Sequence, residues 1–126
     1  MNRRIIVTKN APSAIGPYSQ AVQTGNTIYL SGQIPLDAGS GRMVGEDITE
    51  QTHQVMKNIG EILKAAGFGF RDVVKVTCLL SDITDFQRMN EVYAEYFPEN
   101  SPARSTYEVS NLPRGAKIEI DTIAVK

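Results

Sequence analysis

Cysteine and histidine are almost absent from this chain of 126 residues, which has one of each, Cys78 and His53. A single cysteine excludes an internal disulfide framework and a zinc site built from several thiolates. Cys78 lies in the β-favouring run from residue 73 to residue 80, where a free thiol behaves as a small hydrophobic side chain. We therefore interpret Cys78 as a packing residue, with a reactive thiol as the alternative.

The chain also lacks an excess of charge: it has 13 Lys and Arg against 14 Asp and Glu, a net charge of -1 and a sequence pI near 5.8. This balance gives no electrostatic reason to expect nucleic acid or an anionic membrane as the main partner. A small neutral or anionic metabolite is still compatible with it as a ligand. The apolar run Ile5-Ile6-Val7 is too short for a signal peptide or a membrane span. We expect a cytoplasmic protein with no membrane partner.

Residues for several common kinds of site are missing as well. His53 falls off the apolar stripe of its predicted helix, so we interpret it as a solvated surface residue rather than a ligand or base, and a serine–histidine pair is not expected. Ser31 lacks the strand-to-helix elbow of hydrolases. The glycine-rich segment 39–45 lacks the Gly-Lys-Ser/Thr ending of a phosphate-binding loop. No metal-ligand cluster or cofactor fingerprint is present, and we expect neither a metal nor a cofactor.

The pattern of the remaining residues predicts one α+β domain over residues 1–126. Strands are predicted over residues 3–9, 72–83, 103–110 and 116–125, and a hairpin over residues 19–33 that turns at Gly25-Asn26. A helix is predicted from about residue 48 to residue 66, with Asp47 and Glu50 as its cap and Gly67 as its stop.

A second helix is predicted from a cap at residues 84–87 to Pro98. Its large side chains share one side and are interpreted as core: Phe86, Met89, Tyr93, Tyr96 and Phe97. Two helices of these lengths cover only one face of so wide a sheet. The last strand places both charged and apolar side chains on the other face, so we expect a homo-oligomer with polar pockets where subunits meet.

Arg104 and Glu119 are the remaining candidates for catalytic or binding residues. If strands 103–110 and 116–125 form a hairpin, both side chains can point to the helix-free face. One interpretation is then a cross-strand ion pair. The other is an arginine that grips a substrate carboxylate with two hydrogen bonds while the glutamate handles a water molecule. The pattern leaves both open.

Five motifs that occur in the same order along the chain identify a protein family more specifically than any of these residues alone. The chain resembles the RidA/YjgF family of reactive intermediate deaminases, and the likeness runs almost end to end. The motifs are Ala14-Ile15-Gly16-Pro17-Tyr18-Ser19-Gln20-Ala21, Ser31-Gly32-Gln33-Ile34-Pro35, Asn90-Glu91-Val92-Tyr93, Pro102-Ala103-Arg104-Ser105, and Leu112-Pro113-Arg114-Gly115 with Ile118-Glu119-Ile120.

The resemblance implies a chorismate-mutase-like fold with a mixed sheet and two helices on one face, assembled as a homotrimer with active sites between subunits. It implies hydrolysis of 2-imino acids, the tautomers of enamines such as 2-aminoacrylate, to 2-keto acids and ammonia, without a cofactor. By position, Arg104 is expected to bind the substrate carboxylate, assisted by the backbone of Gly32 and Thr106. Glu119 is expected to orient water and carry its proton, and the remaining pocket residues are Tyr18, Ser31 and Asn90.

Two residues depart from the family pattern. Thr106 stands where many relatives have cysteine, so this chain cannot require a catalytic thiol there. Ser101 replaces the bulky aromatic residue often found before Pro-Ala-Arg, which is expected to widen the mouth of the pocket and leaves the preferred substrate size open.

Two other functions stay open beside the deaminase. The first is a regulatory module that senses keto or amino acids in the same clefts and acts through a protein partner. The second is ribonuclease activity, which is also reported in the family. The near-neutral charge and the lack of an RNA-binding signature argue against it.

Overall fold

A computed structural model describes residues 2–126 and forms one α+β domain. The strands are β1 (Arg4–Ile6), β2 (Ala21–Thr24), β3 (Thr27–Gln33), β4 (Val73–Leu80), β5 (Ala103–Glu108) and β6 (Ile118–Val125). The helices are α1 (Ile48–Ala65) and α2 (Phe86–Tyr96). The predicted order of elements is confirmed, although several predicted strands extend a few residues too far.

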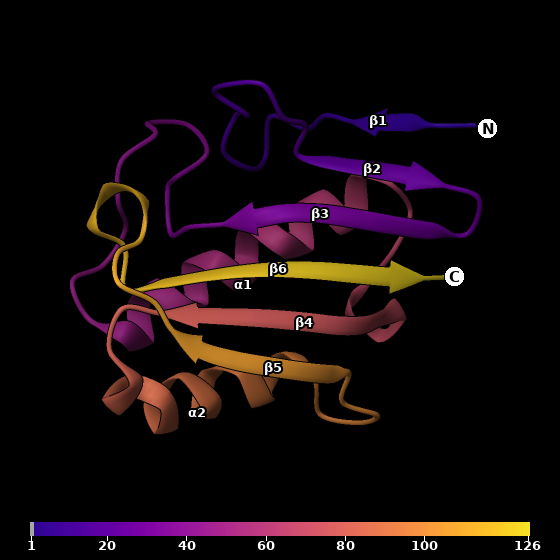
Figure 1. Cartoon of the computed structure of the whole chain (residues 1–126). Helices are drawn as coiled ribbons and strands as arrows, with labels where there is room; N and C mark the ends of the chain where they lie inside the picture. Colours follow the sequence, from indigo (N-terminus) through magenta and orange to yellow (C-terminus); the bar gives the residue numbers. More distant parts are fainter. Residues whose placement is uncertain (1) are drawn as a thin grey trace.

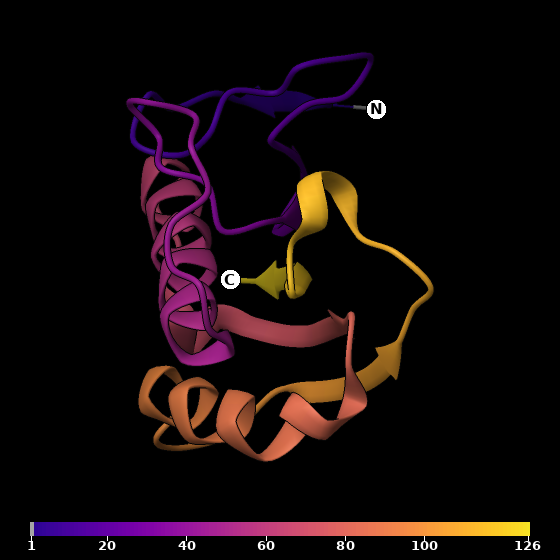
Figure 2. The same ribbon diagram turned by 90° about the vertical axis from the view of Figure 1, so that its left-hand side faces the viewer.

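The strands form one mixed sheet in the order β1-β2-β3-β6-β4-β5. All neighbours are antiparallel except β4 and β5, which run parallel and are joined through α2. α1 lies behind the sheet in Figure 1 and to one side of it in Figure 2, whereas α2 lies below β5 in both views. The buried side chains of both helices share one core with those of β4, so both helices pack against the same face of the sheet. The predicted covering of a single face is therefore confirmed, and we call the uncovered side the open face.

The ends of α1 agree with the sequence. The side chain of Asp47 accepts a hydrogen bond of 2.8 Å from the backbone N–H of Glu50, which caps the first turn. Gly67 follows the helix with φ of +82°, a left-handed conformation that glycine adopts without steric cost. Between these ends the apolar stripe is buried against the sheet; it consists of Ile48, Val55, Met56, Ile59, Ile62 and Leu63.

The start of α2 corrects a detail of the prediction. A 3₁₀ turn over residues 83–85 precedes the helix, and the Asp82 carboxylate accepts a 2.9 Å hydrogen bond from the backbone N–H of Thr84. Asp82 therefore caps the 3₁₀ turn, and α2 itself, with Asp85 as its N-cap residue, has no side-chain cap hydrogen bond. Cys78 is fully buried in the core under this helical layer, which agrees with its interpretation as a packing residue.

The proposed hairpin between the last two strands is wrong. β4 lies between β5 and β6, because the chain after β4 crosses over through α2 and returns parallel to it. The register places Arg104 opposite Val76, on the helix-covered face, and Glu119 opposite Leu79, on the open face. The two residues therefore leave the sheet on opposite sides and do not share one face.

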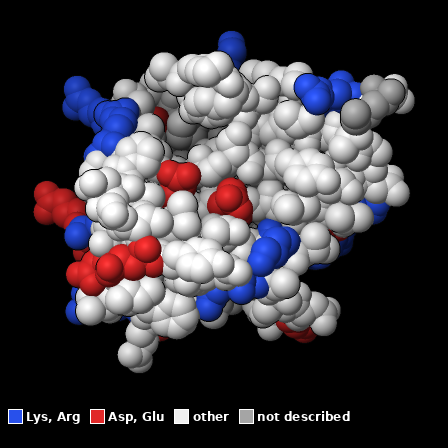
Figure 3. Space-filling view, viewed as in Figure 1, with Lys and Arg blue, Asp and Glu red and all other residues white. Residues whose placement is uncertain are grey.

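The open face leaves large side chains exposed, among them Ile5, Tyr29 and Tyr107 at 49%, 48% and 57% exposure. Figure 3 shows this face as mostly uncharged, with acidic atoms in a hollow over the middle of the sheet. β6 contributes Glu119 and Asp121 there. Within residues 2–126, no helix combines the length and the hydropathy needed to cross a membrane.

Candidate active site

Arg104 lies at the start of the edge strand β5, beside the middle of α2. Its Nη1 donates a 2.7 Å hydrogen bond to Oδ1 of Asn90. Its guanidinium carbon lies 4.7 Å from the ring centre of Tyr93 and 5.4 Å from that of Phe86. These contacts hold a half-buried permanent cation without neutralising it.

A cavity of about 410 Å³ opens next to this arginine. Its wall contains Asn90, Tyr93 and Arg104 together with Ser101 and Pro102. Ser101 therefore lies where a larger residue would reduce the space beside the guanidinium, in agreement with the expectation that serine widens this region. Thr106 follows on the same face of β5, opposite Cys78, and its hydroxyl is buried without a hydrogen-bond partner among the described residues.

Glu119 lies on β6 and is half-buried on the open face. Burial raises the pKa of its carboxyl above the ordinary value, because the charged form loses solvation, and the nearby Asp121 carboxylate raises it further. A glutamate that holds its proton more readily is better suited to transfer protons near neutral pH.

The backbone of β3 is shaped around this glutamate. The register between β3 and β6 shifts between Leu30 and Gln33, so that Ser31 and Gly32 form an irregularity in the strand. A Cβ placed on Gly32 would collide with the carboxylate of Glu119. The absence of a side chain at Gly32 therefore leaves room for the Glu119 carboxylate in its present position.

Ser31 and Tyr18 surround the same end of the sheet. The Ser31 hydroxyl donates a 2.6 Å hydrogen bond to the backbone oxygen of Ser19. Tyr18 is 52% exposed, and it lines a small cavity of about 60 Å³ together with Gly32. Tyr18 follows a tight turn in which its N–H donates to the oxygen of Gly16, whose φ is +126°.

The expected site residues thus fall into two clusters. The arginine cluster consists of Asn90, Arg104 and Thr106 on the helix-covered side, and the glutamate cluster consists of Tyr18, Ser31, Gly32 and Glu119 at the open face. A single chain does not bring the two clusters together. Among residues 2–126 the one contact within 4.0 Å between a basic and an acidic side chain joins His53 and Glu95, so the cross-strand pair between Arg104 and Glu119 is absent.

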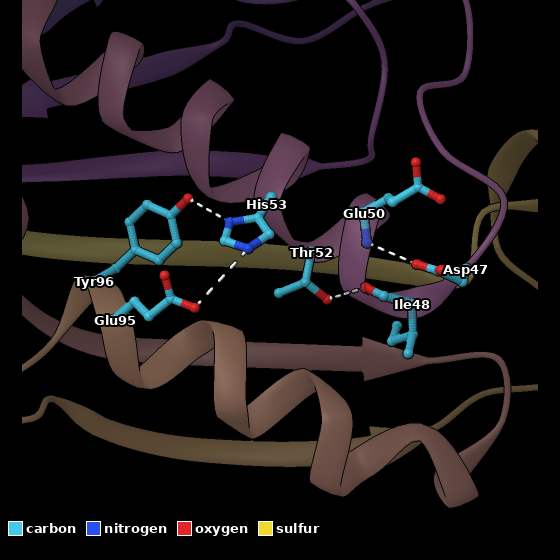
Figure 4. Close-up of polar contacts among 7 residues, drawn as sticks. All are labelled: Asp47, Ile48, Glu50, Thr52, His53, Glu95 and Tyr96. Carbon is cyan, nitrogen blue, oxygen red and sulfur yellow. Dashed lines mark hydrogen bonds and ion pairs between the residues drawn. The ribbon is translucent and has the colours of Figure 1, made fainter.

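His53 is only partly solvated and links the two helices, as Figure 4 shows. Its Nδ1 shares a 2.9 Å hydrogen bond with the Tyr96 hydroxyl, and its Nε2 lies 3.9 Å from Glu95. These contacts are on the helical layer, away from both clusters, and agree with a structural role for this histidine. Figure 4 also shows the Asp47 cap of α1 in the same layer.

Sequence reasoning missed the part that two aromatic residues play around Arg104. Both were assigned to the core stripe of the helix; this is confirmed for Tyr93, whereas Phe86 is 37% exposed and lies outside the core. Both rings also contact the guanidinium. Their spacing of four and three residues from Asn90 places all three on one side of a helix, which is the signal that could have identified them.

The fold and these clusters define a class of protein: a small α+β domain with an arginine suited to a carboxylate ligand and a separate glutamate suited to proton transfer. A family model described as Endoribonuclease L-PSP matches residues 8–126. The chain belongs to this family, which is the RidA/YjgF family, and the resemblance seen in the motifs is confirmed.

The relatives include deaminases at high identity. The chain is 54% identical over 124 residues to the human 2-iminobutanoate/2-iminopropanoate deaminase, which covers 98% of this chain and 90% of the relative. It is 51% identical to Reactive Intermediate Deaminase A, chloroplastic, of Arabidopsis thaliana, with 98% of this chain and 66% of that protein covered.

Solved structures agree with the fold. The crystal structure of Escherichia coli TdcF with bound serine matches with a TM-score of 0.94 and 39% identity, covering 98% of each chain. RidA from the Antarctic bacterium Psychrobacter also matches with a TM-score of 0.94, at 41% identity over 98% of this chain and 99% of that one.

Proposed function

We propose that this protein is a hydrolytic deaminase that converts reactive 2-imino acids, including those derived from 2-aminoacrylate, to 2-keto acids and ammonia. The observation that carries the proposal is the 54% identity over 98% of the chain to deaminases named for 2-iminobutanoate and 2-iminopropanoate. The reaction needs no enzyme nucleophile, because an imine carbon is already electrophilic, and positioning with one proton relay suffices. We expect no metal and no cofactor.

We further propose that the active protein is a homotrimer of chorismate-mutase-like subunits. Two observations support a shared site: Arg104 and Glu119 leave one chain on opposite sides of the sheet, and the open face exposes apolar side chains such as Tyr29. Packing the open face against other copies places the glutamate cluster of one subunit next to the arginine cluster of its neighbour.

In this site Arg104 binds the substrate carboxylate through two parallel N–H groups. Asn90 accepts one hydrogen bond from the guanidinium and so orients it, while the backbone N–H groups of Gly32 and Thr106 complete the carboxylate site. Tyr18 and Ser31 line the remainder of the pocket.

Glu119 then drives the hydrolysis. It accepts a proton from a water molecule as the water oxygen bonds to the imine carbon, and it returns that proton to the nitrogen. The proton of the new hydroxyl then passes through Glu119 to the nitrogen as the carbon–nitrogen bond breaks, so that the ketone forms and ammonia leaves. The raised pKa of the Glu119 carboxyl supports this relay, because the residue must both take up and release the proton.

The test uses an imine generated in situ by an amino acid oxidase, with and without the protein. We expect Glu119→Gln to abolish hydrolysis while 2-oxobutanoate still binds, and Arg104→Lys to lose most activity because an ammonium cannot form the two parallel hydrogen bonds. Unchanged turnover in Glu119→Gln would remove the proton relay from the proposal.

Mixing the two inactive variants tests the shared site. If each site takes Arg104 from one subunit and Glu119 from its neighbour, about a quarter of the sites in randomly mixed trimers contain both native residues, and activity reappears. If both residues act within one chain, no site is complete and mixing restores nothing.

A second candidate function is a sensor of small amino or keto acids that acts through a protein partner. The TdcF structure with bound serine favours it, because serine is an amino acid and not an imine. A sensor needs Arg104 but not Glu119. Tight 2-oxobutanoate binding without imine hydrolysis in the wild-type protein would favour this function.

The name of the family model raises the question of RNA cleavage. A net charge of -1 gives little attraction for phosphates, so we expect any RNA cleavage to disappear on further purification while deaminase activity stays. A cytoplasmic location is our expectation, although one relative is described as chloroplastic.

A further inference from the structure

The guanidinium of Arg104 lies between two aromatic rings of the same helix. Its central carbon is 4.7 Å from the ring centre of Tyr93 and 5.4 Å from that of Phe86. These residues are seven apart on α2, which corresponds to about 10.5 Å along a helix axis. Asn90 lies between them in the sequence and accepts the 2.7 Å hydrogen bond from Nη1. Three side chains of α2 therefore hold one cation from β5.

This arrangement keeps the arginine available for a ligand. A ring face attracts a cation without occupying its N–H groups, and Asn90 accepts from one of the five donors that a guanidinium carries. Within the part of the chain that the structure describes, no Asp or Glu oxygen lies within 4.0 Å of Arg104. A carboxylate held at that distance would compete with an anionic substrate, whereas the rings do not.

Tyr93 forms the inner wall of this arrangement. It is 6% exposed, its ring packs 4.8 Å from that of Phe97, and its hydroxyl is buried without a hydrogen-bond partner among residues 2–126. Since the hydroxyl makes no hydrogen bond, the contribution of this residue comes from its ring. Phe86, at 37% exposure, forms the outer wall.

We propose that Tyr93, together with Phe86, is a positioning residue that fixes the guanidinium of Arg104 in the orientation needed to receive a carboxylate. The identity of that carboxylate as a 2-imino acid or 2-keto acid rests on the proposed function. The fixed orientation of the guanidinium does not, because its contacts are present in the chain itself.

The first test measures the order of the guanidinium without using activity. In the full-length protein, the Nε–H signal of Arg104, assigned through its loss in Arg104→Lys, is followed by ¹⁵N relaxation. We expect a rigid, ring-current-shifted signal in wild type and in Tyr93→Phe, which keeps the ring. Tyr93→Leu is expected to make the signal mobile. Phe68→Leu is the matched control, since Phe68 is similarly buried at 7% exposure and makes no ring contact with Arg104.

The second test measures selectivity for charge. Affinity for 2-oxobutanoate is compared with affinity for its uncharged amide by calorimetry. Tyr93→Leu is expected to weaken 2-oxobutanoate binding about tenfold and to leave amide binding unchanged, while Tyr93→Phe and Phe68→Leu keep the wild-type preference. Equal weakening of both ligands would indicate a purely structural role and overturn the proposal.

The outcomes separate this inference from the proposed function. A wild-type protein that neither hydrolyses imines nor binds 2-oxobutanoate contradicts the proposed function. In that case the relaxation data alone test whether Tyr93 and Phe86 fix the orientation of the Arg104 guanidinium. An Arg104 signal that stays rigid in Tyr93→Leu overturns the inference whatever the activity. If Tyr93→Leu does not fold, Phe86→Leu at the exposed outer wall takes its place, with the same expected mobility and the same contrary result.

Discussion

Gly32 and Glu119 are in direct contact across the β3–β6 pair. A Cβ built on Gly32 would lie 2.9 Å from the carboxyl carbon of Glu119 and 3.1 Å from its Cγ. The atoms that such a Cβ meets belong to the outer part of a flexible side chain and not to the backbone. A larger residue at position 32 therefore displaces the glutamate before it disturbs the sheet.

Replacing Gly32 by alanine is expected to separate activity from stability. Gly32→Ala moves the Glu119 carboxylate and lowers imine hydrolysis about 10- to 100-fold. The free energy of unfolding in urea stays within about 1 kcal/mol of wild type. Gly39→Ala is the control, because its Cβ would meet Asp37 at 3.4 Å in a loop. Full activity in Gly32→Ala would show that the glutamate position is not critical.

Replacing Asp121 by asparagine is expected to change the pH dependence. The Asp121 carboxylate contributes to the raised pKa of Glu119, so its neutralisation lowers that pKa. A lower pKa keeps Glu119 ionised at more acidic pH, and the acid limb of the kcat/KM profile moves to lower pH. Glu46→Gln, an equal charge change at an exposed loop residue, is expected to leave the limb in place. A shift toward higher pH would contradict the assignment of Glu119 as the base.

Replacing Asn90 by aspartate is expected to weaken ligand binding while preserving the fold. A carboxylate at the position 2.7 Å from Nη1 forms an ion pair with Arg104 and competes with the substrate. We expect the affinity for 2-oxobutanoate to fall about tenfold in calorimetry. Asn26→Asp, in the exposed β2–β3 turn, serves as the control and keeps normal affinity. Tighter binding in Asn90→Asp would mean that Arg104 does not bind the carboxylate.

The thiol of Cys78 is expected to be unreactive in the native protein. Burial raises its pKa to about 11, so little thiolate forms at pH 8, and the side chain is inaccessible to reagents. We expect iodoacetamide to modify the native chain at least about 100-fold more slowly than the guanidinium-unfolded chain, measured by mass spectrometry. Cys78→Ala should retain deaminase activity. Rapid labelling of the folded protein would support the alternative of a reactive thiol.

A charge placed on the open face is expected to disrupt assembly. Tyr29 is 48% exposed and lies opposite Ile123 on that face. Tyr29→Glu should give monomers by sedimentation analysis, with a folded circular dichroism spectrum and no hydrolysis, because in the proposed trimer the two clusters meet only between subunits. Ile83→Glu, at 44% exposure in the turn before α2, should keep the assembly state of the wild-type protein. Active monomers of Tyr29→Glu would contradict a site shared between subunits.

Local sequence patterns determined the elements of this fold and several of their ends. The three- and four-residue spacing of apolar side chains from Ile48 to Leu63 predicted α1, and Asp47 and Gly67 predicted its limits. The Gly25-Asn26 turn predicted the β2–β3 hairpin. These signals can be recognised in the sequence because they depend on residues a few positions apart. The relative positions of such residues follow from the local backbone conformation.

Strand order is decided by tertiary structure, and it reverses one expectation about the site. No local pattern indicates that β4 separates β5 from β6, because parallel pairing through a crossover joins segments distant in sequence. That order places Arg104 beside Phe86 and Tyr93 and Glu119 against Gly32, on opposite sides of the sheet. The sequence motifs predicted the polar residues of the candidate site. The packing of α2 on β5 decided which side chains contact the guanidinium of Arg104.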